Sequence, residues 1–235
     1  MKPPLQIPPD LYDSFTLNRL VKVEYRYIDN SSFTIKNKFF YKKDIDNYIE
    51  RIRKGENFYY GRTDEFLRKA INKYPINNKT VGIIGSQKPL YESFVLAYGG
   101  IPITIDYHKI LTDDKRLTLY TVKEYEINPV KFDSIISISS IEHDGLGRYG
   151  DPVNPVGDIE AMTKIRDMLN DDGIFFLSVP VGKDKLVWNA HRIYGRLRLP
   201  LLLKKWEILK VVGYPFYIKL LKRERQPVFV LKKKL

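Results

Sequence analysis

The stretch FDSIISIS at residues 132–139 is predicted to form a strand that is covered on both faces, because nearly all of its residues are apolar or small. Short apolar runs of the same kind lie at residues 81–84, 101–105, 117–122 and 174–179, with helical patterns at 89–98 and 158–169. Two further strand candidates, at 206–212 and 227–231, follow. This strand–helix alternation predicts an α/β fold with a mostly parallel, doubly wound sheet.

The N-terminal third has a different pattern. Residues 1–20 are rich in proline and are expected to form an arm, followed by a strand at 21–28. Helices are predicted at 44–53 and at 63–74, the second with Thr63 as its N-cap. We therefore expect an N-terminal extension and cap segment over residues 1–78 and a Rossmann-like domain over residues 79–235.

Composition narrows the class of protein. A chain of 235 residues is long enough for one α/β domain with a continuous core. It contains no cysteine, which excludes disulfides and thiolate sites and fits a reducing, cytoplasmic location. The first residues hold no long apolar run, so neither a signal peptide nor a membrane span is expected there.

The positive charge is concentrated at the C-terminal end. Residues 183–235 hold 15 Lys and Arg against 3 Asp and Glu, which equals the net charge of +12 of the whole chain, whereas residues 1–182 hold 25 of each. Such a basic region predicts an acidic partner, namely a phosphate-linked or anionic substrate, nucleic acid or a membrane surface. A solvated face, or contact with an acidic neighbouring domain, is the alternative.

Three strand ends carry the residues expected to bind a ligand, because ligands of such sheets lie beyond the carboxyl ends of the strands. The first strand is followed by Gly85, Ser86 and Gln87, and the second ends at Asp106, 21 residues after Gly85. An acidic residue at about this spacing is placed to accept hydrogen bonds from ribose hydroxyls. Alternatively, an Asp after a strand is a turn residue or a helix cap. The strand at 132–139 is followed by a segment dense in ionisable groups, Ser139-Ser140-Ile141-Glu142-His143-Asp144.

The segment FDSIISISSIEHDGLGRYGDP, with GSQKPLYE before it and WNAHRIYGRLRLP after it, resembles a domain family of unknown function. That family is similar to class I S-adenosylmethionine-dependent methyltransferases, and SSIEHDGLGRYGDP is the most specific part of the resemblance. It implies a Rossmann-like sheet of seven strands with an antiparallel last strand. It also implies S-adenosylmethionine as the cofactor, held by Tyr60, Gly85, Ser86, Gln87, Asp106, Ser139, Ser140 and Ile141. The glycine-rich loop of such enzymes is reduced here to Gly85, and the alternative for Tyr60 is a packing residue.

The catalytic candidates follow from the chemistry that the resemblance implies. A hydroxyl oxygen becomes a good methyl acceptor when a base removes its proton, and His143 oriented by Asp144 suits that role. His191, expected on a helix, is a second candidate base, and the three residues together offer a divalent-metal site that nothing in their spacing requires. Alternatively, Glu142 and His143 cap the following loop.

The prediction is therefore an O-methyltransferase that acts on a sugar hydroxyl of a glycan or glycolipid precursor. The sugar rests on the resemblance and on the basic C-terminal end. Two alternatives stay open: a non-catalytic Rossmann-like binding module for an anionic partner, and a nucleic-acid methyltransferase.

Overall fold

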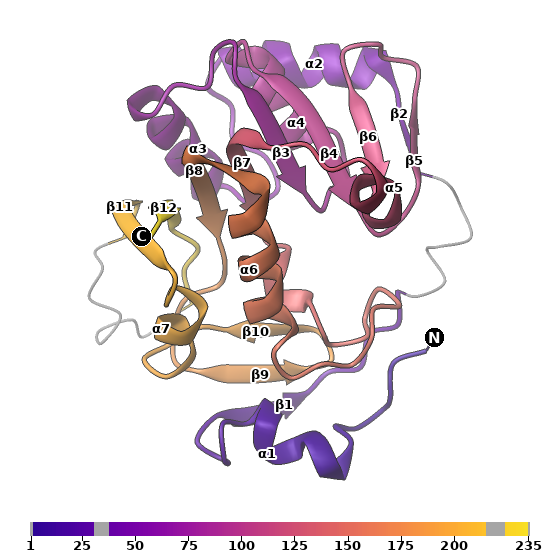
Figure 1. Cartoon of the computed structure of the whole chain (residues 1–235), viewed down its shortest axis with the longest axis vertical. Helices are drawn as coiled ribbons and strands as arrows, with labels where there is room; N and C mark the ends of the chain where they lie inside the picture. The colour runs from indigo at the N-terminus through magenta and orange to yellow at the C-terminus, as the bar shows by residue number, and fades with distance from the viewer. Residues whose placement is uncertain (1, 31–37, 215–223, 235) are drawn as a thin grey trace.

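A sheet with mostly parallel strands forms the centre of the molecule in the computed structural model, which describes residues 2–30, 38–214 and 224–234. Within those residues the sheet has seven strands (Figure 1). In spatial order they are β11 (Trp206–Val212), β12 (Val228–Lys233), β8 (Leu169–Ser178), β7 (Phe132–Ile138), β3 (Thr80–Ile84), β4 (Ile101–Asp106) and β6 (Thr118–Thr121). β12 runs antiparallel to both of its neighbours, and all other pairs are parallel. The predicted α/β fold, with its antiparallel last strand, is confirmed.

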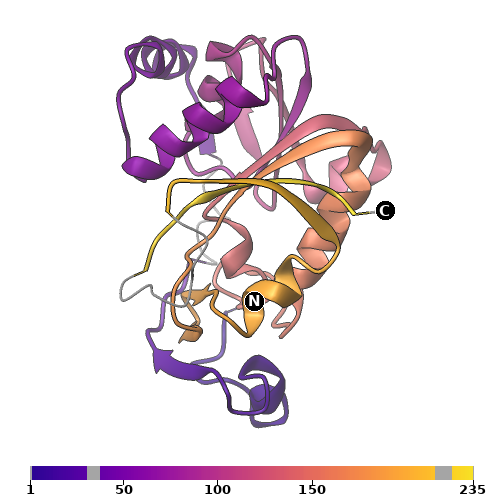
Figure 2. The same cartoon turned by 90° about the vertical axis from the view of Figure 1, so that its left-hand side faces the viewer.

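Helices cover both faces of this sheet. α3 (Arg62–Lys73) and α4 (Leu90–Ala97) pack on one face, with α2 (Lys42–Arg53) against α4. The other face carries α5 (Val122–Ile127), α6 (Gly157–Met168) and α7 (Arg198–Leu202). Figure 2 shows α3, in purple, and α6, in orange, on opposite sides of the strands.

Alternation along the central strands divides the core into two layers. In β7, Ile135 belongs to the cluster under α5 and α6, whereas Ile136 belongs to the cluster under α3 and α4. β8 behaves in the same way, because Phe175 and Phe176 point to opposite faces. Burial on both faces explains why these strands are apolar at every position rather than at every second one.

A second, smaller sheet lies beyond the carboxyl ends of β3 and β8 (Figure 1). It consists of β1 (Lys22–Tyr25), β9 (Lys185–Trp188) and β10 (His191–Ile193), with β9 and β10 forming a hairpin. The sequence predicted a helix around His191, and this prediction is wrong. The segment pairs as a strand because both sides of β9 find backbone partners, which local sequence does not reveal.

The proline-rich start of the chain packs against this small sheet. It contains η1 (Pro9–Leu11) and α1 (Tyr12–Phe15), and the ring of Phe15 meets that of Trp188 edge-on at a centroid distance of 5.0 Å. The indole of Trp188 also donates a hydrogen bond to the carbonyl of Pro4, 3.2 Å away. Residues 2–20 are therefore a packed layer rather than the arm that was predicted, because buried aromatic side chains hold them in place.

Two further local features differ from, or add to, the predictions. The N-cap of α3 is Gly61 rather than Thr63, whose hydroxyl instead donates to the carbonyl of Gln226 at 2.8 Å. β2 (Lys38–Phe40) pairs in parallel with β5 (Ile110–Thr112) to form a two-stranded sheet that was not predicted.

The domain boundary near residue 78 stays a prediction. No helix within the described ranges is long and apolar enough to cross a membrane.

Candidate active site

The loops after β3 and β7 touch at the point where the order of strands reverses. The chain runs from β3 outward to β4 and β6 and then returns to β7 on the other side of β3. Gly85, in the loop after β3, has a φ of +73°, and a Cβ atom added to it would overlap the hydroxyl of Ser140. Ligands of doubly wound sheets bind at such a switch point, so the geometry places the candidate site here.

Asp106 ends β4 beside this loop and is 7% exposed. Its Oδ2 accepts a hydrogen bond from the backbone N–H of Ser86 at 2.9 Å, and its Oδ1 accepts one from that of His108 at 2.8 Å. The Lys38 ammonium lies 3.5 Å from Oδ2 and also donates to the carbonyl of Ser86 at 3.0 Å. Asp106 thus occupies the predicted place, and Lys38 is a neighbour that sequence reasoning missed.

A buried carboxyl group lies at the end of β7. Glu142 belongs to η3 (Ile141–His143), is 1% exposed, and accepts a hydrogen bond at Oε1 from the hydroxyl of Ser139 at 2.6 Å. Burial raises the pKa of Glu142 to about 7, although the bond from Ser139 and the charges of Arg148 and Arg192 oppose the shift. Tyr60 lies near Ser139, and burial raises the pKa of its phenol to about 12.

His143 is held by backbone rather than by a carboxylate. Its Nδ1 lies 2.6 Å from the carbonyl oxygen of Ala190 in the β9–β10 turn. Burial, together with the charge of Arg148, lowers the pKa of His143 to about 3. The expectation that Asp144 orients this ring is wrong, because Ala190 occupies Nδ1 and the carboxylate nearest Nε2 is that of Glu142, at 3.8 Å. Burial raises the pKa of Asp144 well above its usual value.

His191 lies near His143, at a distance of 6.3 Å between ring centroids. Burial lowers the pKa of His191, and the charges of Arg148, Arg26 and Lys185 act in the same direction while Glu224 opposes them. The metal alternative for His143, Asp144 and His191 is not supported, because the described part of the chain contains no group of three His, Cys, Asp or Glu side chains suited to hold a metal ion.

The GLGRYGD part of the most specific motif is a loop organised by one carboxylate. Asp151 accepts hydrogen bonds from the backbone N–H groups of Gly145 at 2.8 Å, Gly147 at 3.1 Å and Tyr149 at 3.2 Å. Gly145 has a φ of +78°, and a Cβ atom there would overlap the carbonyl of Asn154. The loop presents Arg148 and Tyr149 beside His143, and Arg148 donates to the same carbonyl of Ala190 at 3.2 Å. Arg148 and Tyr149 belong to the segment SSIEHDGLGRYGDP, but the local sequence indicates no role for either residue.

The structure places two of the predicted cofactor-binding residues, Ile141 and Gln87, in opposite environments. The side chain of Ile141 is fully buried in the core cluster of α5 and α6, so its contribution to a site comes from its backbone. Gln87 is exposed in the loop after β3.

Several cations of the basic C-terminal region have partners within the part of the chain that the structure describes. Arg192 and Arg198 are buried and form ion pairs with Asp158, at 3.7 Å and 2.6 Å. Exposed or half-buried lysines pair with Asp171, Asp172, Glu24 and Glu224. Lys219, Lys222 and Arg223 lie outside the described residues. The surplus charge of the region therefore includes cations with structural partners.

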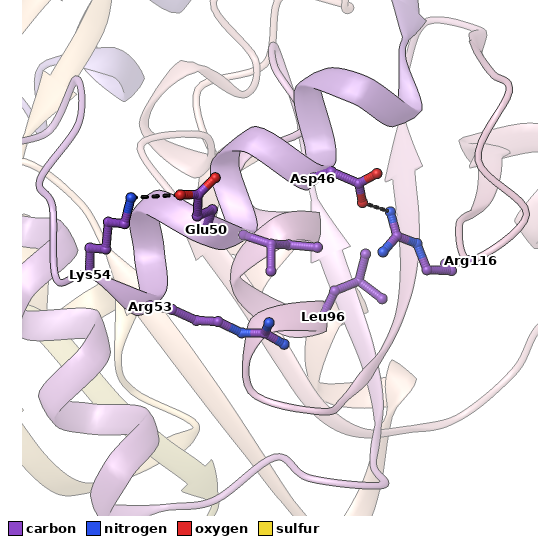
Figure 3. A pocket seen from close by; sticks show the side chains of 7 residues that line it. Asp46, Glu50, Arg53, Lys54, Leu96 and Arg116 are labelled. Carbon is purple, nitrogen blue, oxygen red and sulfur yellow. Dashed lines mark hydrogen bonds and ion pairs between the residues drawn. The ribbon is translucent and has the colours of Figure 1, made fainter.

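A hollow of about 550 Å³ lies on the surface of α2, away from the strand ends (Figure 3). Asp46, Glu50, Arg53, Lys54 and Arg116 line it with mixed charge, together with Ile49 and Leu96. Asp46 and Arg116 form an ion pair across it at 2.6 Å. These side chains largely neutralise one another, so the hollow offers no concentrated charge to a ligand.

Solved structures of similar shape define the class of fold. The crystal structure of Burkholderia thailandensis 1,6-didemethyltoxoflavin-N1-methyltransferase with bound 1,6-didemethyltoxoflavin and S-adenosylhomocysteine has a TM-score of 0.56 at 14% identity, over 81% of this chain and 87% of that chain. A S-adenosylmethionine-dependent methyltransferase from Clostridium acetobutylicum has a TM-score of 0.51 at 13% identity, over 82% of this chain and 98% of that chain. This is the Rossmann-like fold of class I methyltransferases, as the resemblance implied.

Residues 78–215 match the family model described as "Caenorhabditis protein of unknown function, DUF268". The chain belongs to this family. No curated relative matches the sequence. That SSIEHDGLGRYGDP marks the family stays a prediction.

Proposed function

We propose that this protein is a S-adenosylmethionine-dependent methyltransferase whose cofactor binds where the loops after β3, β4 and β7 meet. The observation that carries the proposal is the buried carboxylate of Asp106, tied to the N–H of Ser86 at the switch point of the sheet. A carboxylate in this position is placed to accept hydrogen bonds from ribose hydroxyls. The fold, shared with a methyltransferase that holds S-adenosylhomocysteine, supports the same assignment.

The side chains around the loops fit such a cofactor chemically. S-adenosylmethionine carries ribose hydroxyls, an ammonium group and a sulfonium cation, all of which favour carboxylate neighbours. Asp106 and Glu142 supply two carboxyl groups, and within the described residues no hydrogen-bond donor reaches Oε2 of Glu142. Lys38 would share Asp106 with the ribose. When bound, the cofactor supplies an activated methyl group.

For the acceptor, we propose a hydroxyl of a phosphate-linked or anionic sugar. Arg26 and Arg148 lie close enough to His191 to lower its pKa, whereas Lys185 beside them is paired with Glu24 and Glu224. Cations there would favour an anionic acceptor over a neutral one.

Calorimetry with S-adenosylhomocysteine tests cofactor binding. Asp106→Ala should weaken binding by about 1–3 kcal/mol, because charge-assisted hydrogen bonds to the ribose are lost. Asp133→Ala is the matched control, since Asp133 also accepts a backbone N–H bond, from Thr80 at 3.0 Å, but at the amino end of the sheet. Equal affinity in wild type and Asp106→Ala, or absence of binding in the wild type, would refute the proposal.

The acceptor is tested with S-adenosylmethionine labelled in its methyl group. We expect label on phosphorylated sugars and none on the matching neutral methyl glycosides. Label on RNA or DNA would instead identify a nucleic-acid methyltransferase.

A further inference from the structure

Two hydrogen-bond acceptors face each other beside the strand end of β7. A carbonyl oxygen only accepts, so the Nδ1 atom of His143, 2.6 Å from the carbonyl of Ala190, carries the hydrogen. Nε2 of the neutral ring then holds a lone pair, and it lies 3.8 Å from Oε1 of Glu142. This distance is too long for a direct hydrogen bond, and a donor placed near both atoms would satisfy them together.

The other carboxyl oxygen of Glu142 has no partner within the described structure. Oε2 is buried and no described donor reaches it, whereas Oε1 is held by Ser139. Leaving a buried carboxylate oxygen unpaired is costly, and such groups are often found where a ligand completes the bonding. The other titratable or charged groups around Glu142 are Tyr60 before α3, Tyr91 on α4, Asp144, Arg148 and Tyr149 in the following loop, Arg192 on β10 and Tyr194 after it.

We propose that Glu142, rather than His143, is the base that accepts the proton of the acceptor hydroxyl. The proposal rests on the function proposed above. It replaces the expectation that His143 is the base, because a ring buried beside Arg148 is a poor proton acceptor near neutral pH, whereas burial raises the pKa of Glu142 to about 7.

The proposed step balances without a further reactant. Glu142 takes the hydroxyl proton at Oε2 while the acceptor oxygen forms its bond to the methyl carbon. The carbon–sulfur bond breaks, and sulfur keeps the electron pair. Glu142 leaves the step protonated and returns its proton to solvent.

The position of Glu142 can be tested without knowing the acceptor. The probes are S-adenosylhomocysteine and its analogue in which a carbon bearing an amino group replaces the sulfur, so that an ammonium group stands where the methyl group would be. Wild type at pH 8 should bind the analogue at least about tenfold more tightly, because the ammonium group pairs with the Glu142 carboxylate. This preference should decline as pH falls through about 7 and be absent in Glu142→Gln, whereas Glu142→Asp should retain its pH dependence.

Glu92→Gln is the matched control. Glu92 is also fully buried, accepts a hydrogen bond from the hydroxyl of Thr104 at 2.7 Å, and has its pKa raised by burial to about 7, but it lies on α4 rather than at the end of β7. This variant should keep both the preference and its pH dependence.

Three results would overturn the proposal, and they differ from one another. Equal weakening of both probes in Glu142→Gln would place Glu142 at the amino-acid end that the probes share. An unchanged preference would make Glu142 a structural residue. Failure of wild type to bind either probe would refute the proposed cofactor itself, and the base with it.

Discussion

At the scale of the residue, Gly85 shows how one position joins two loops. Its φ of +73° favours glycine, and the space where a Cβ atom would stand is filled by the Ser140 side chain, whose own Cβ lies 3.1 Å away. The sequence predicted that Gly85 lets backbone approach a ligand. The structure adds that a side chain at position 85 would overlap the loop after β7.

Gly85→Ala should therefore destabilise the fold by about 1–3 kcal/mol and weaken binding of S-adenosylhomocysteine, since both strand-end loops must shift. Gly85→Ala combined with Ser140→Gly removes the overlap and should recover stability except for about 1 kcal/mol of backbone strain. Urea unfolding of the two single variants and the double variant measures the coupling. Simple additivity of the two substitutions would mean that the loops do not meet.

At the scale of the element, one carboxylate connects the α6–α7 side of the sheet to the β9–β10 hairpin. Asp158 on α6 accepts bonds from Arg198 on α7, at 2.6 and 2.9 Å, and from the hydroxyl of Tyr194 at 3.0 Å, and it pairs with Arg192 on β10 at 3.7 Å. Arg192 in turn donates to the carbonyl of Asp144, which directly precedes the loop GLGRYGD at residues 145–151. The network thus positions the hairpin whose Ala190 carbonyl holds His143.

Asp158→Ala should cost about 3–5 kcal/mol of unfolding free energy, because two buried guanidinium groups lose their shared carboxylate. Asp172→Ala is the control, since that carboxylate is 98% exposed and solvent screens its pair with Lys232, so this variant should unfold like wild type. Denaturant unfolding compares them. A small effect of Asp158→Ala would show that water replaces the lost carboxylate and that the network is not closed.

At the scale of the whole molecule, buried acids make stability depend on pH. Glu92 is completely buried, and burial raises its pKa from 4.5 to about 7. Between pH 4.5 and pH 7, Glu92 therefore holds a proton in the folded state that it has released in the unfolded state. The contribution of Glu92 to the unfolding free energy is greatest below about pH 4.5 and is lost as the pH rises to 7.

The unfolding free energy of wild type should therefore fall relative to Glu92→Gln by about 3 kcal/mol between pH 4.5 and 8. Urea unfolding of both proteins across this range measures the difference, which cancels all other titrating groups to first order. Parallel curves would show that the Glu92 carboxyl is hydrated in the folded state.

The sequence by itself determined the sheet and the positions of its strand ends. Central strands covered on both faces need apolar residues throughout, and helices need one apolar face, so local patterns along the chain from residue 80 onward are sufficient. The spacing from Gly85 to Asp106 also placed both at the same edge, because carboxyl ends of parallel strands lie together. β9, by contrast, pairs with β1, which is distant in the sequence, and β10 completes a hairpin with β9 where the local pattern around His191 predicted a helix.

Only the tertiary structure decided which groups face one another at that edge. Lys38 reaches Asp106 from a strand 68 residues earlier, and Ala190 reaches His143 from a hairpin 47 residues later, so no local pattern contains either contact. The protonation of His143 and Glu142 follows from the same contacts, since burial and neighbouring charges set the pKa of a side chain and its residue type does not. The ionisable residues at the strand ends can therefore be identified from the sequence. The choice between Glu142 and His143 as the base depends on the burial and neighbouring charges that the tertiary structure gives them.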